Sequence, residues 1–395
     1  MEKGVWAGTH HGSFGAAAES MKVLAETPLS AKQVRRLTTL IGEDRVAERR
    51  AQVIEFTEKT LMERTTPKPG VEPPEVGVLM LDNGTHQRRD HFGEPGKQTH
   101  WKQETGGLAL SMASEVHERD PCPDFPAWLF DSDVVAEIAS LAQRRETPEN
   151  TEKEGEPNST GEDESPLDPQ GKAGFAWTPT VVSREVIAST EGTDIARHLE
   201  WVAWEHGITA ASRQAFVADG ASSIWTIHKT YFSQMTPILD LMHALSYAYR
   251  AAAVLDDAGL YRRWATAIWQ GRVGEVLAEL QAHQQRLSPP PQDASADDPR
   301  QRVARAITYY TNHQSRMNYP DYRRLGLPIT SSLMESTIKQ LSRRVKGTEK
   351  FWTRSHAEAI LQLRADYLSD SQPLHGFWKR WRQNLTGSNR YRTHA

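Results

Sequence analysis

The sequence predicts an α/β protein: a mixed sheet with helices, interrupted by an all-helical insertion and preceded by a helical region. Three observations predict this fold class. Short apolar runs, such as residues 76–81 and 215–218, end at turn residues, as buried strands do. Stretches with apolar residues at helical spacing follow several of these runs, and such alternation is typical of α/β sheets. Residues 251–327 show helical spacing throughout.

The size and composition of the chain suit one large domain with one or two smaller modules. It has 395 residues, of which 38% are hydrophobic and 25% charged, as in ordinary globular proteins. No apolar run approaches the ~20 residues that cross a bilayer, and no apolar signal core follows Met1. We therefore expect a cytoplasmic protein with no membrane partner.

Cysteine usage limits the metal chemistry that the chain can offer. Cys122 is the only cysteine, so the chain has neither an intrachain disulfide nor a cysteine-based zinc finger. Any metal site must use carboxylates and histidines. Oxygen ligands of this kind suit Mg²⁺ or Mn²⁺.

Charge is distributed unevenly along the chain, although the net charge is only −4. Residues 146–168 hold nine acidic residues and a single basic one, Lys153. From Lys339 to Ala395 there are twelve Lys and Arg residues against four Asp and Glu, with tryptophans among them. The C-terminal part is therefore the candidate for contact with a polyanion such as DNA.

Residues 1–72 are expected to form an N-terminal helical region. Ser30 can cap a helix that starts at Ala31, after which apolar residues recur at helical spacing. Two functions fit this region: a packing or oligomerisation bundle, which we favour, and a module that binds DNA ends. The second is suggested by five arginines, Arg35, Arg36, Arg45, Arg49 and Arg50.

Residues 73–250 are expected to form the first part of the sheet. The Pro/Gly-rich segment 67–74 ends the helical region, and the strand at 76–81 stops at Asp82. Residues 98–112 supply a second strand, in which two adjacent glycines, Gly106 and Gly107, mark a bend or bulge.

An acidic stretch at 144–172 interrupts this part. It is rich in Pro, Ser and Gly and has few large apolar side chains. Such a stretch cannot bury enough surface to offset the entropy of ordering it, so we expect a flexible inserted loop.

The remaining strands of this part alternate with helices. A strand within 175–189 leads to a helix over 194–206. The strand at 215–218 ends at Asp219-Gly220 before a further helix, and residues 237–241 form a strand that runs into a long helix containing His243.

The all-helical insertion over 251–327 is broken by a Pro/Asp/Ser linker at 288–299. The sheet-forming part resumes over 328–370, where Ser331 or Ser332 can cap a helix that carries Glu335. A second helix covers 355–368, and residues 371–395 form a basic, aromatic tail.

Three carboxylates stand out by position: Asp82 and Asp219 at the ends of apolar runs, and Glu335 on a later helix. Strand ends meet at one edge of an open α/β sheet, and a helix packed across that edge can bring the third acid. Three convergent carboxylates can hold two divalent metals ~4 Å apart, as in-line phosphoryl transfer requires. A single Asp-Gly after a strand is also a common turn, so neither aspartate is decisive alone.

Asp240 and His243 form a second polar pair, spaced i to i+3 at the start of a helix. They are interpreted either as groups that support a metal site or position DNA, or as a helix cap.

Two segments resemble the Kra-type bacterial insertion-sequence transposases, Mutator-related DDE enzymes with an RNase H-like fold. They are VADGASSIWTIHKTYFSQMTPILDLMHALSYAY (217–249) and ITSSLMESTIKQLSRRVKGTEKFWTRSHAEAILQLRADYLS (329–369). The family shows an Asp-Gly, then Asp-Gly-Ala, then Asp/Cys-x-x-His, and after a helical insertion a Glu-Ser near Arg-x-Lys-Gly and a Trp. Here the matching residues are Asp82, Asp219-Gly220-Ala221, Asp240 with His243, Glu335-Ser336, and Arg344 to Gly347 with Trp352. Asn83 stands between Asp82 and Gly84, which departs from the family pattern, as does the long acidic loop.

The resemblance implies a transposase that binds two Mg²⁺ (or Mn²⁺) ions through Asp82, Asp219 and Glu335, with Asp240 and His243 in supporting or DNA-positioning roles. Its partners would be double-stranded DNA, at transposon ends and target, and further copies of the chain in a homodimer or higher oligomer, at the nucleoid. We expect DNA contacts from Arg343, Arg344, Lys346, Lys350, Trp352, Arg354, Lys379, Arg380, Trp381 and Arg382.

Packing or solvated roles remain alternatives for Trp352 and for the tail. Two other functions compete with transposition. One is an RNase H-like structure-specific DNA nuclease, which would use the same acids without strand transfer. The other is an inactive DNA-binding transposase remnant, against which the presence of all three acids speaks.

Overall fold

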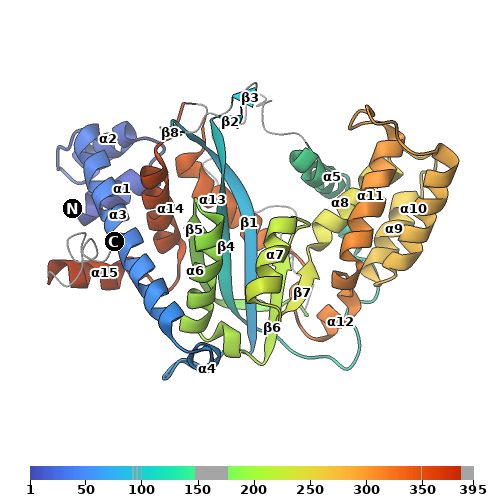
Figure 1. Ribbon diagram of the computed structural model, residues 1–395, viewed down its shortest axis with the longest axis horizontal. Coiled ribbons are helices and arrows are strands. Elements are labelled where there is room, and N and C mark those ends of the chain that lie inside the picture. Colours follow the sequence, from blue (N-terminus) through green and yellow to red (C-terminus); the bar gives the residue numbers. More distant parts are fainter. Residues whose placement is uncertain (91–92, 95–96, 99, 147–176, 348, 384–395) are drawn as a thin grey trace. The chain divides into compact units, whose positions relative to one another are not determined.

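The computed structural model describes residues 1–90, 93–94, 97–98, 100–146, 177–347 and 349–383 (Figure 1). Its contacts divide the chain into two compact units. Unit 1 comprises Met1–Met112, Val181–Gln214 and Met334–Ala395, and unit 2 comprises Ala113–Thr180 and Ala215–Leu333. The protein is of the α/β class, as the sequence predicts, with six strands in a mixed sheet.

The strands of unit 1 follow the order β5-β4-β1, with β8 beside β1. β1 and β4 are antiparallel in one unbroken register from Val76↔Met112 to Gln87↔Trp101, whereas β8 is parallel to the far end of β1. The bounds are β1 Val76–Arg88, β4 Trp101–Ala113, β5 Thr180–Ser189 and β8 Phe351–Trp352, and a small hairpin consists of β2 Gly93–Glu94 and β3 Lys97–Gln98.

Two details of this register correct the sequence-based expectations. β1 does not stop at Asp82 but continues for six residues to Arg88, because β4 supplies pairing partners over the whole length. The ladder also passes through Gly106 and Gly107 without a bulge. A Cβ at Gly106 would lie 2.7 Å from Ile338 Cδ1, so this glycine lets helix α13 (Ser332–Val345) pack closely on β4.

The helices of unit 1 include a long N-terminal one, α3, that packs along α14 (Figure 1). A Cβ at Gly42 would lie 2.6 Å from the carbonyl oxygen of Ala359, so glycine permits this close crossing. The helices are α1 Glu2–His10, α2 Phe14–Leu24, α3 Ala31–Glu58, α4 Leu61–Thr65, α6 Gly192–Glu205, η2 Ile208–Ala210, α13 (from Met334), α14 Arg354–Leu368 and α15 Pro373–Arg382.

The N-terminal region supports the packing interpretation. Ser30 caps α3 as predicted, in a capping box with Gln33. Arg45 and Arg49 are 5% and 2% exposed and pair with acidic residues of α14, so they cannot reach DNA. Only Arg35, Arg36 and Arg50 of the five arginines are on the surface.

Unit 2 joins two parallel strands to a group of helices. β6 (Arg213–Ala218, from Ala215 in this unit) pairs with β7 (Thr236–Leu239). In the helical part, α5 packs on α8 and α10 on α11 (Figure 1). The helices are η1 Ala127–Phe130, α5 Ser132–Glu146, α7 Ser222–Tyr231, α8 Leu241–Ala252, α9 Leu260–Trp269, α10 Val273–Leu287, α11 Pro299–His313, η3 Gln314–Arg316 and α12 Tyr319–Arg324.

The all-helical character of 251–327 and the linker near 288–299 are therefore confirmed. The predicted acidic loop is shorter at its start, because residues 144–146 belong to α5. Residues 147–176 of that loop lie outside the described part of the chain. Among the described residues, none of the helices combines the length and the apolar character that a bilayer span needs.

Candidate active site

Two acidic residues follow directly on the paired strands of unit 2. The ladder of β6 and β7 ends at Ala218↔Leu239, and the next residue on each strand is an aspartate, Asp219 or Asp240. The Asp240 N–H donates to the Ala218 carbonyl at 2.9 Å, which extends the pairing. Because adjacent strands lie ~4.8 Å apart, both acids stand at the same edge of the sheet. Both are buried.

The turn that carries Asp219 is tightly held. Its Oδ1 accepts a hydrogen bond from the Ala221 N–H at 3.0 Å, and its carbonyl oxygen accepts one from Trp225 Nε1 at 2.8 Å. Gly220 is required by close packing, since a Cβ there would lie 2.4 Å from Tyr309 Cε2. The sequence therefore predicts this strand end correctly, and the contact with α11 explains the glycine.

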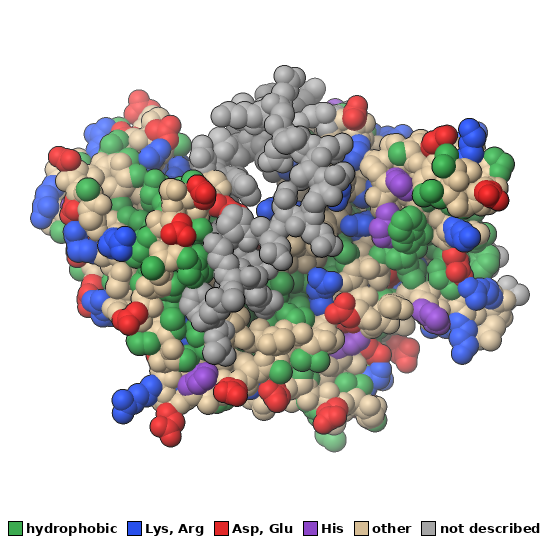
Figure 2. Space-filling view, turned by 180° about the vertical axis from the view of Figure 1, so that it is seen from behind, with side chains coloured by type: hydrophobic (Ala, Val, Ile, Leu, Met, Phe, Trp, Pro, Cys, Tyr) green, Lys and Arg blue, Asp and Glu red, His purple; other side chains and the backbone are tan. Residues whose placement is uncertain are grey.

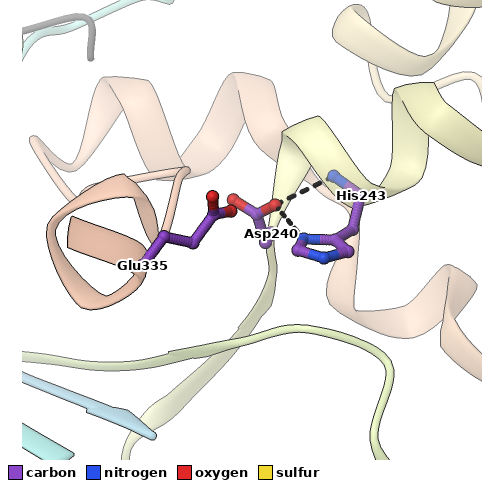
Figure 3. Close-up of side chains that lie close together, drawn as sticks. All are labelled: Asp240, His243 and Glu335. Atoms are coloured by element: carbon purple, nitrogen blue, oxygen red, sulfur yellow. Dashed lines mark hydrogen bonds and ion pairs between the residues drawn. The ribbon is translucent and has the colours of Figure 1, made fainter. Parts of the chain in front are cut away.

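Asp240 is both the N-cap of α8 and the partner of His243 (Figure 3). Its Oδ2 accepts hydrogen bonds from the His243 N–H at 2.9 Å and from His243 Nδ1 at 2.7 Å, and its Oδ1 accepts one from the Ser331 N–H at 2.8 Å. The cap interpretation is thus confirmed. The same bond orients the imidazole: with the proton on Nδ1, Nε2 carries the lone pair, as in histidines that bind metals.

Glu335 lies on the first turn of α13, four residues after Ser331, whose N–H is bound to Asp240. One ligand atom each from Asp240, His243 and Glu335 lies within 4.8 Å of the others. Figure 3 shows the Glu335 carboxylate pointing toward that of Asp240, with His243 on the far side. Among the described residues, Asp240, His243 and Glu335 form the group of possible metal ligands in which all three ligand atoms lie this close together.

The donor set of this group fits a divalent cation. The carboxylates of Asp240 and Glu335 point toward one another, so a cation between them would be attracted to both. In the described part of the chain Asp240 has no Lys or Arg partner, only backbone N–H groups and the imidazole. The carboxylate oxygens of Asp240 and Glu335 suit Mg²⁺ or Mn²⁺. His243, on the far side of Asp240, would orient that carboxylate.

Asp82 belongs to unit 1 and is half-buried on β1. Its register partner is Gly106, and directly opposed residues present their side chains on one face of a sheet. That face is the one on which α13 packs, since a Cβ at Gly106 would also lie 3.2 Å from Met334 Cε. Asp82 therefore faces the helix that carries Glu335. Its convergence with Asp219, in unit 2, stays a prediction.

Burial removes two residues from the predicted DNA contacts. Arg344 is 4% exposed: its guanidinium lies 4.4 Å above the Phe14 ring and its Nε donates to the Gly8 carbonyl at 3.0 Å. Burial lowers the pKa of Arg344 to about 10. Trp352 is also buried, and its Nε1 donates to the Val345 carbonyl at 2.9 Å. Neither side chain presents its polar or aromatic face to a nucleic acid, so packing is the correct interpretation.

Other predicted contacts remain on the surface. Arg343, Lys346 and Lys379 are exposed. Lys350 is half-buried, which lowers the pKa of its ammonium, and it donates to the Arg343 carbonyl at 3.3 Å. Arg354 is exposed and pairs with Glu191 at 2.6 Å.

The tail helix α15 is mainly a packing element. Phe377 and Trp378 are buried in a core with Ile41 and Leu363, and Trp381 packs against it. Arg380 pairs with Glu48 at 2.8 Å, and Arg382 pairs with Glu2. The packed-helix alternative is therefore right for Trp381, and residues 384–395 lie outside the described part.

Surface charge on the face in Figure 2 is interspersed: Lys and Arg side chains alternate with Asp and Glu over the coloured atoms. A nucleic-acid contact on that face would therefore depend on single well-placed cations rather than on a broad basic area.

The sequence-based interpretation missed the residues of α11 and η3 that border the Asp219 turn. They are Tyr309, His313 and Arg316. The only available signal was a run of aromatic and basic residues in a helical insertion, which is too general to assign.

Comparison with known proteins identifies no relative: no family model matches the chain, and no curated protein sequence is similar to it.

Proposed function

We propose that this chain is a DNA transposase of the DDE type, as its resemblance to the Kra-type insertion-sequence enzymes implies. The observation that carries the proposal is the meeting of acids at one sheet edge. Asp219 and Asp240 follow paired parallel strands. Glu335 lies on the first turn of a helix, and Ser331, the residue before that helix, donates its N–H to Asp240. The mixed sheet with helix-linked parallel strands is compatible with an RNase H-like fold.

In this proposal Asp82, Asp219 and Glu335 bind two divalent ions, Mg²⁺ or Mn²⁺. Such ions supply charge stabilisation for in-line displacement at a phosphodiester and lower the pKa of water. Asp240 holds the His243 ring so that Nε2 faces away from the carboxylate. We therefore assign His243 to a supporting ligand or a DNA-positioning contact.

The proposed partner is double-stranded DNA, at transposon ends and target, with two or more copies of the chain assembled on it. Of the predicted contacts, Arg343, Lys346, Lys350, Arg354 and Lys379 keep surface access and would bind phosphates. A cytoplasmic, nucleoid-associated location follows from this function.

The test uses a plasmid that carries the inverted repeats flanking the gene. With Mg²⁺ or Mn²⁺, the wild-type protein should cut at the repeats and join the ends to target DNA. Asp219→Asn and Glu335→Gln should each lower cleavage at least about a thousandfold, because each removes a ligand charge at the developing transition state. DNA affinity without metal should stay within a few-fold.

Glu349→Gln is the matched control, since Glu349 is exposed on the same segment and undergoes the same chemical change. It should leave cleavage unchanged. Cleavage that survives in Glu335→Gln but not in Glu349→Gln would place the third ligand at Glu349. Cleavage without end joining would identify a structure-specific nuclease, and DNA binding without cleavage an inactive remnant.

A further inference from the structure

Among the described residues of unit 2, Arg316 and Arg323 each stack on a tryptophan, and they differ in their counter-ions. The Arg323 guanidinium lies 4.1 Å from the Trp269 ring centre, and that of Arg316 lies 4.2 Å from the Trp225 ring centre. Arg323 is fully buried, and its Nε donates to Asp120 at 2.8 Å in a two-pronged ion pair. Its charge is neutralised within the fold, so its role is structural.

Arg316 has the stacking partner without the acid. It is half-buried, and one N–H donates to His313 Nδ1 at 2.9 Å. No carboxylate of the described residues lies within ion-pair distance of it. Burial lowers the pKa of Arg316, yet a guanidinium stays protonated at neutral pH. The fold therefore fixes the position of the Arg316 guanidinium, and an anion that neutralises it would have to come from a ligand.

The position of Arg316 connects it with the Asp219 turn. Trp225, on which it stacks, donates its indole N–H to the Asp219 carbonyl at 2.8 Å. His313, to which it donates, packs over Gly220, where a Cβ would lie 3.2 Å from His313 Nε2. Two independent contacts thus tie the guanidinium to the turn that carries a proposed metal ligand.

The hydrogen bond also defines the role of His313. Because a guanidinium can only donate, Nδ1 must accept, and the ring orients the arginine fork through this bond. A guanidinium has five N–H groups in a planar fork that matches a phosphate, and His313 uses one of them.

We infer that Arg316 binds a phosphodiester group of the strand that reaches the Asp219–Gly220 turn, and that His313 positions it. That the phosphate belongs to DNA rests on the proposed function. That the site takes a phosphate-type anion rests on Arg316, His313 and Trp225 alone.

The first experiment measures binding of a short DNA duplex without divalent metal, over a range of salt concentrations. Arg316→Gln should weaken binding about tenfold and lower the slope of log affinity against log salt by about 0.9, the loss of one phosphate contact. Arg316→Lys should restore the slope but not the full affinity, because a lysine keeps the charge and loses the fork. Arg324→Gln is the control, since Arg324 ends the next helix along the chain, α12, and has its own partner, Asp321.

The second experiment uses inorganic phosphate as the probe and needs no DNA. Phosphate should raise the melting temperature of the wild-type protein above that in chloride of equal ionic strength, and Arg316→Gln should lose this difference. An unchanged phosphate effect and salt slope in Arg316→Gln, or equal losses in Arg324→Gln, would overturn the inference. If the phosphate effect depends on Arg316 while metal-dependent cleavage is absent, the anion site stands and the transposase proposal fails.

Discussion

Buried charges occur in both units, but they are neutralised in different ways. Where α3 packs on α14 in unit 1, buried arginines face buried acids. Arg45 binds both oxygens of Asp366, at 2.8 and 3.0 Å, and Arg49 binds Glu358 at 2.8 Å. At the edge of β6 and β7 in unit 2, Asp240 is equally buried but receives only hydrogen bonds from backbone and imidazole.

This difference separates a structural network from the proposed binding site. An arginine with a fitted acid offsets the cost of burying both charges, and the pair then holds two helices in register. A buried acid whose partners are backbone N–H groups and an imidazole, rather than a guanidinium, can still take up a cation from solution. The same reasoning applies to buried cations. Arg323 has a fitted acid, Asp120, and is structural, whereas Arg316 has no acid within ion-pair distance among the described residues.

The largest effect is expected from breaking the neutralised network. Arg49→Met should lower the free energy of unfolding by about 3–5 kcal/mol, because Glu358 would remain buried without its cation. Its neighbour Arg50 offers the matched control: it pairs with Asp194 at 3.5 Å on the surface, so Arg50→Met should cost less than about 1 kcal/mol. Urea unfolding measures both. Equal losses of unfolding free energy in Arg49→Met and Arg50→Met would mean that the buried Arg49–Glu358 pair is no more important for stability than the surface pair.

A smaller effect is expected from adding a divalent cation to the proposed site at Asp240 and Glu335. Mn²⁺ or Mg²⁺ at roughly 100 times its dissociation constant should stabilise the protein by about 2.7 kcal/mol. Glu335→Gln should reduce this gain strongly, because it removes the charge of one ligand. Glu349→Gln should behave as wild type. Full metal stabilisation in Glu335→Gln, seen by thermal unfolding, would contradict the metal assignment.

The smallest effect concerns His198, which lies beside the neutralised network. Burial, and then the charges of Arg49 and Arg45, lower the pKa of His198 well below its usual value. Below about pH 6.5, His198 therefore binds a proton in the unfolded state but not in the folded state. Stability should be complete above about pH 6.5 and fall below it, by at most about 1.4 kcal/mol per pH unit.

His198→Phe should remove that contribution from the pH dependence, which urea unfolding at a series of pH values would show. His375→Gln, at an exposed histidine, serves as its control and should leave the slope unchanged. A slope that is the same in His198→Phe and wild type would mean that His198 titrates normally in the folded protein.

Much of the local structure and part of the site could be predicted from the sequence. The caps at Ser30 and Asp240, the strand end at Asp219 and the helical run after residue 251 depend on residues a few positions apart. Such signals survive in the sequence because the backbone groups they satisfy are neighbours. The sequence therefore places Asp219 at a strand end and Asp240 and Glu335 at helix starts, as the structure does, but it wrongly ends β1 at Asp82.

The sequence by itself thus determined the helix starts at Ala31 and Leu241 and the strand end before Asp219, because local hydrogen bonding and periodicity make those choices. It did not determine the end of β1, which pairing with β4 extends past Asp82. Tertiary structure alone decided which charged side chains are paired inside the protein and which remain accessible to a ligand. Arg45 meets Asp366 across 321 residues of chain, and Arg344 stacks on Phe14. Arg316 stacks on Trp225, and no acid of the described residues lies within ion-pair distance of it. Burial and pairing depend on partners that are distant in sequence, and no local pattern records them.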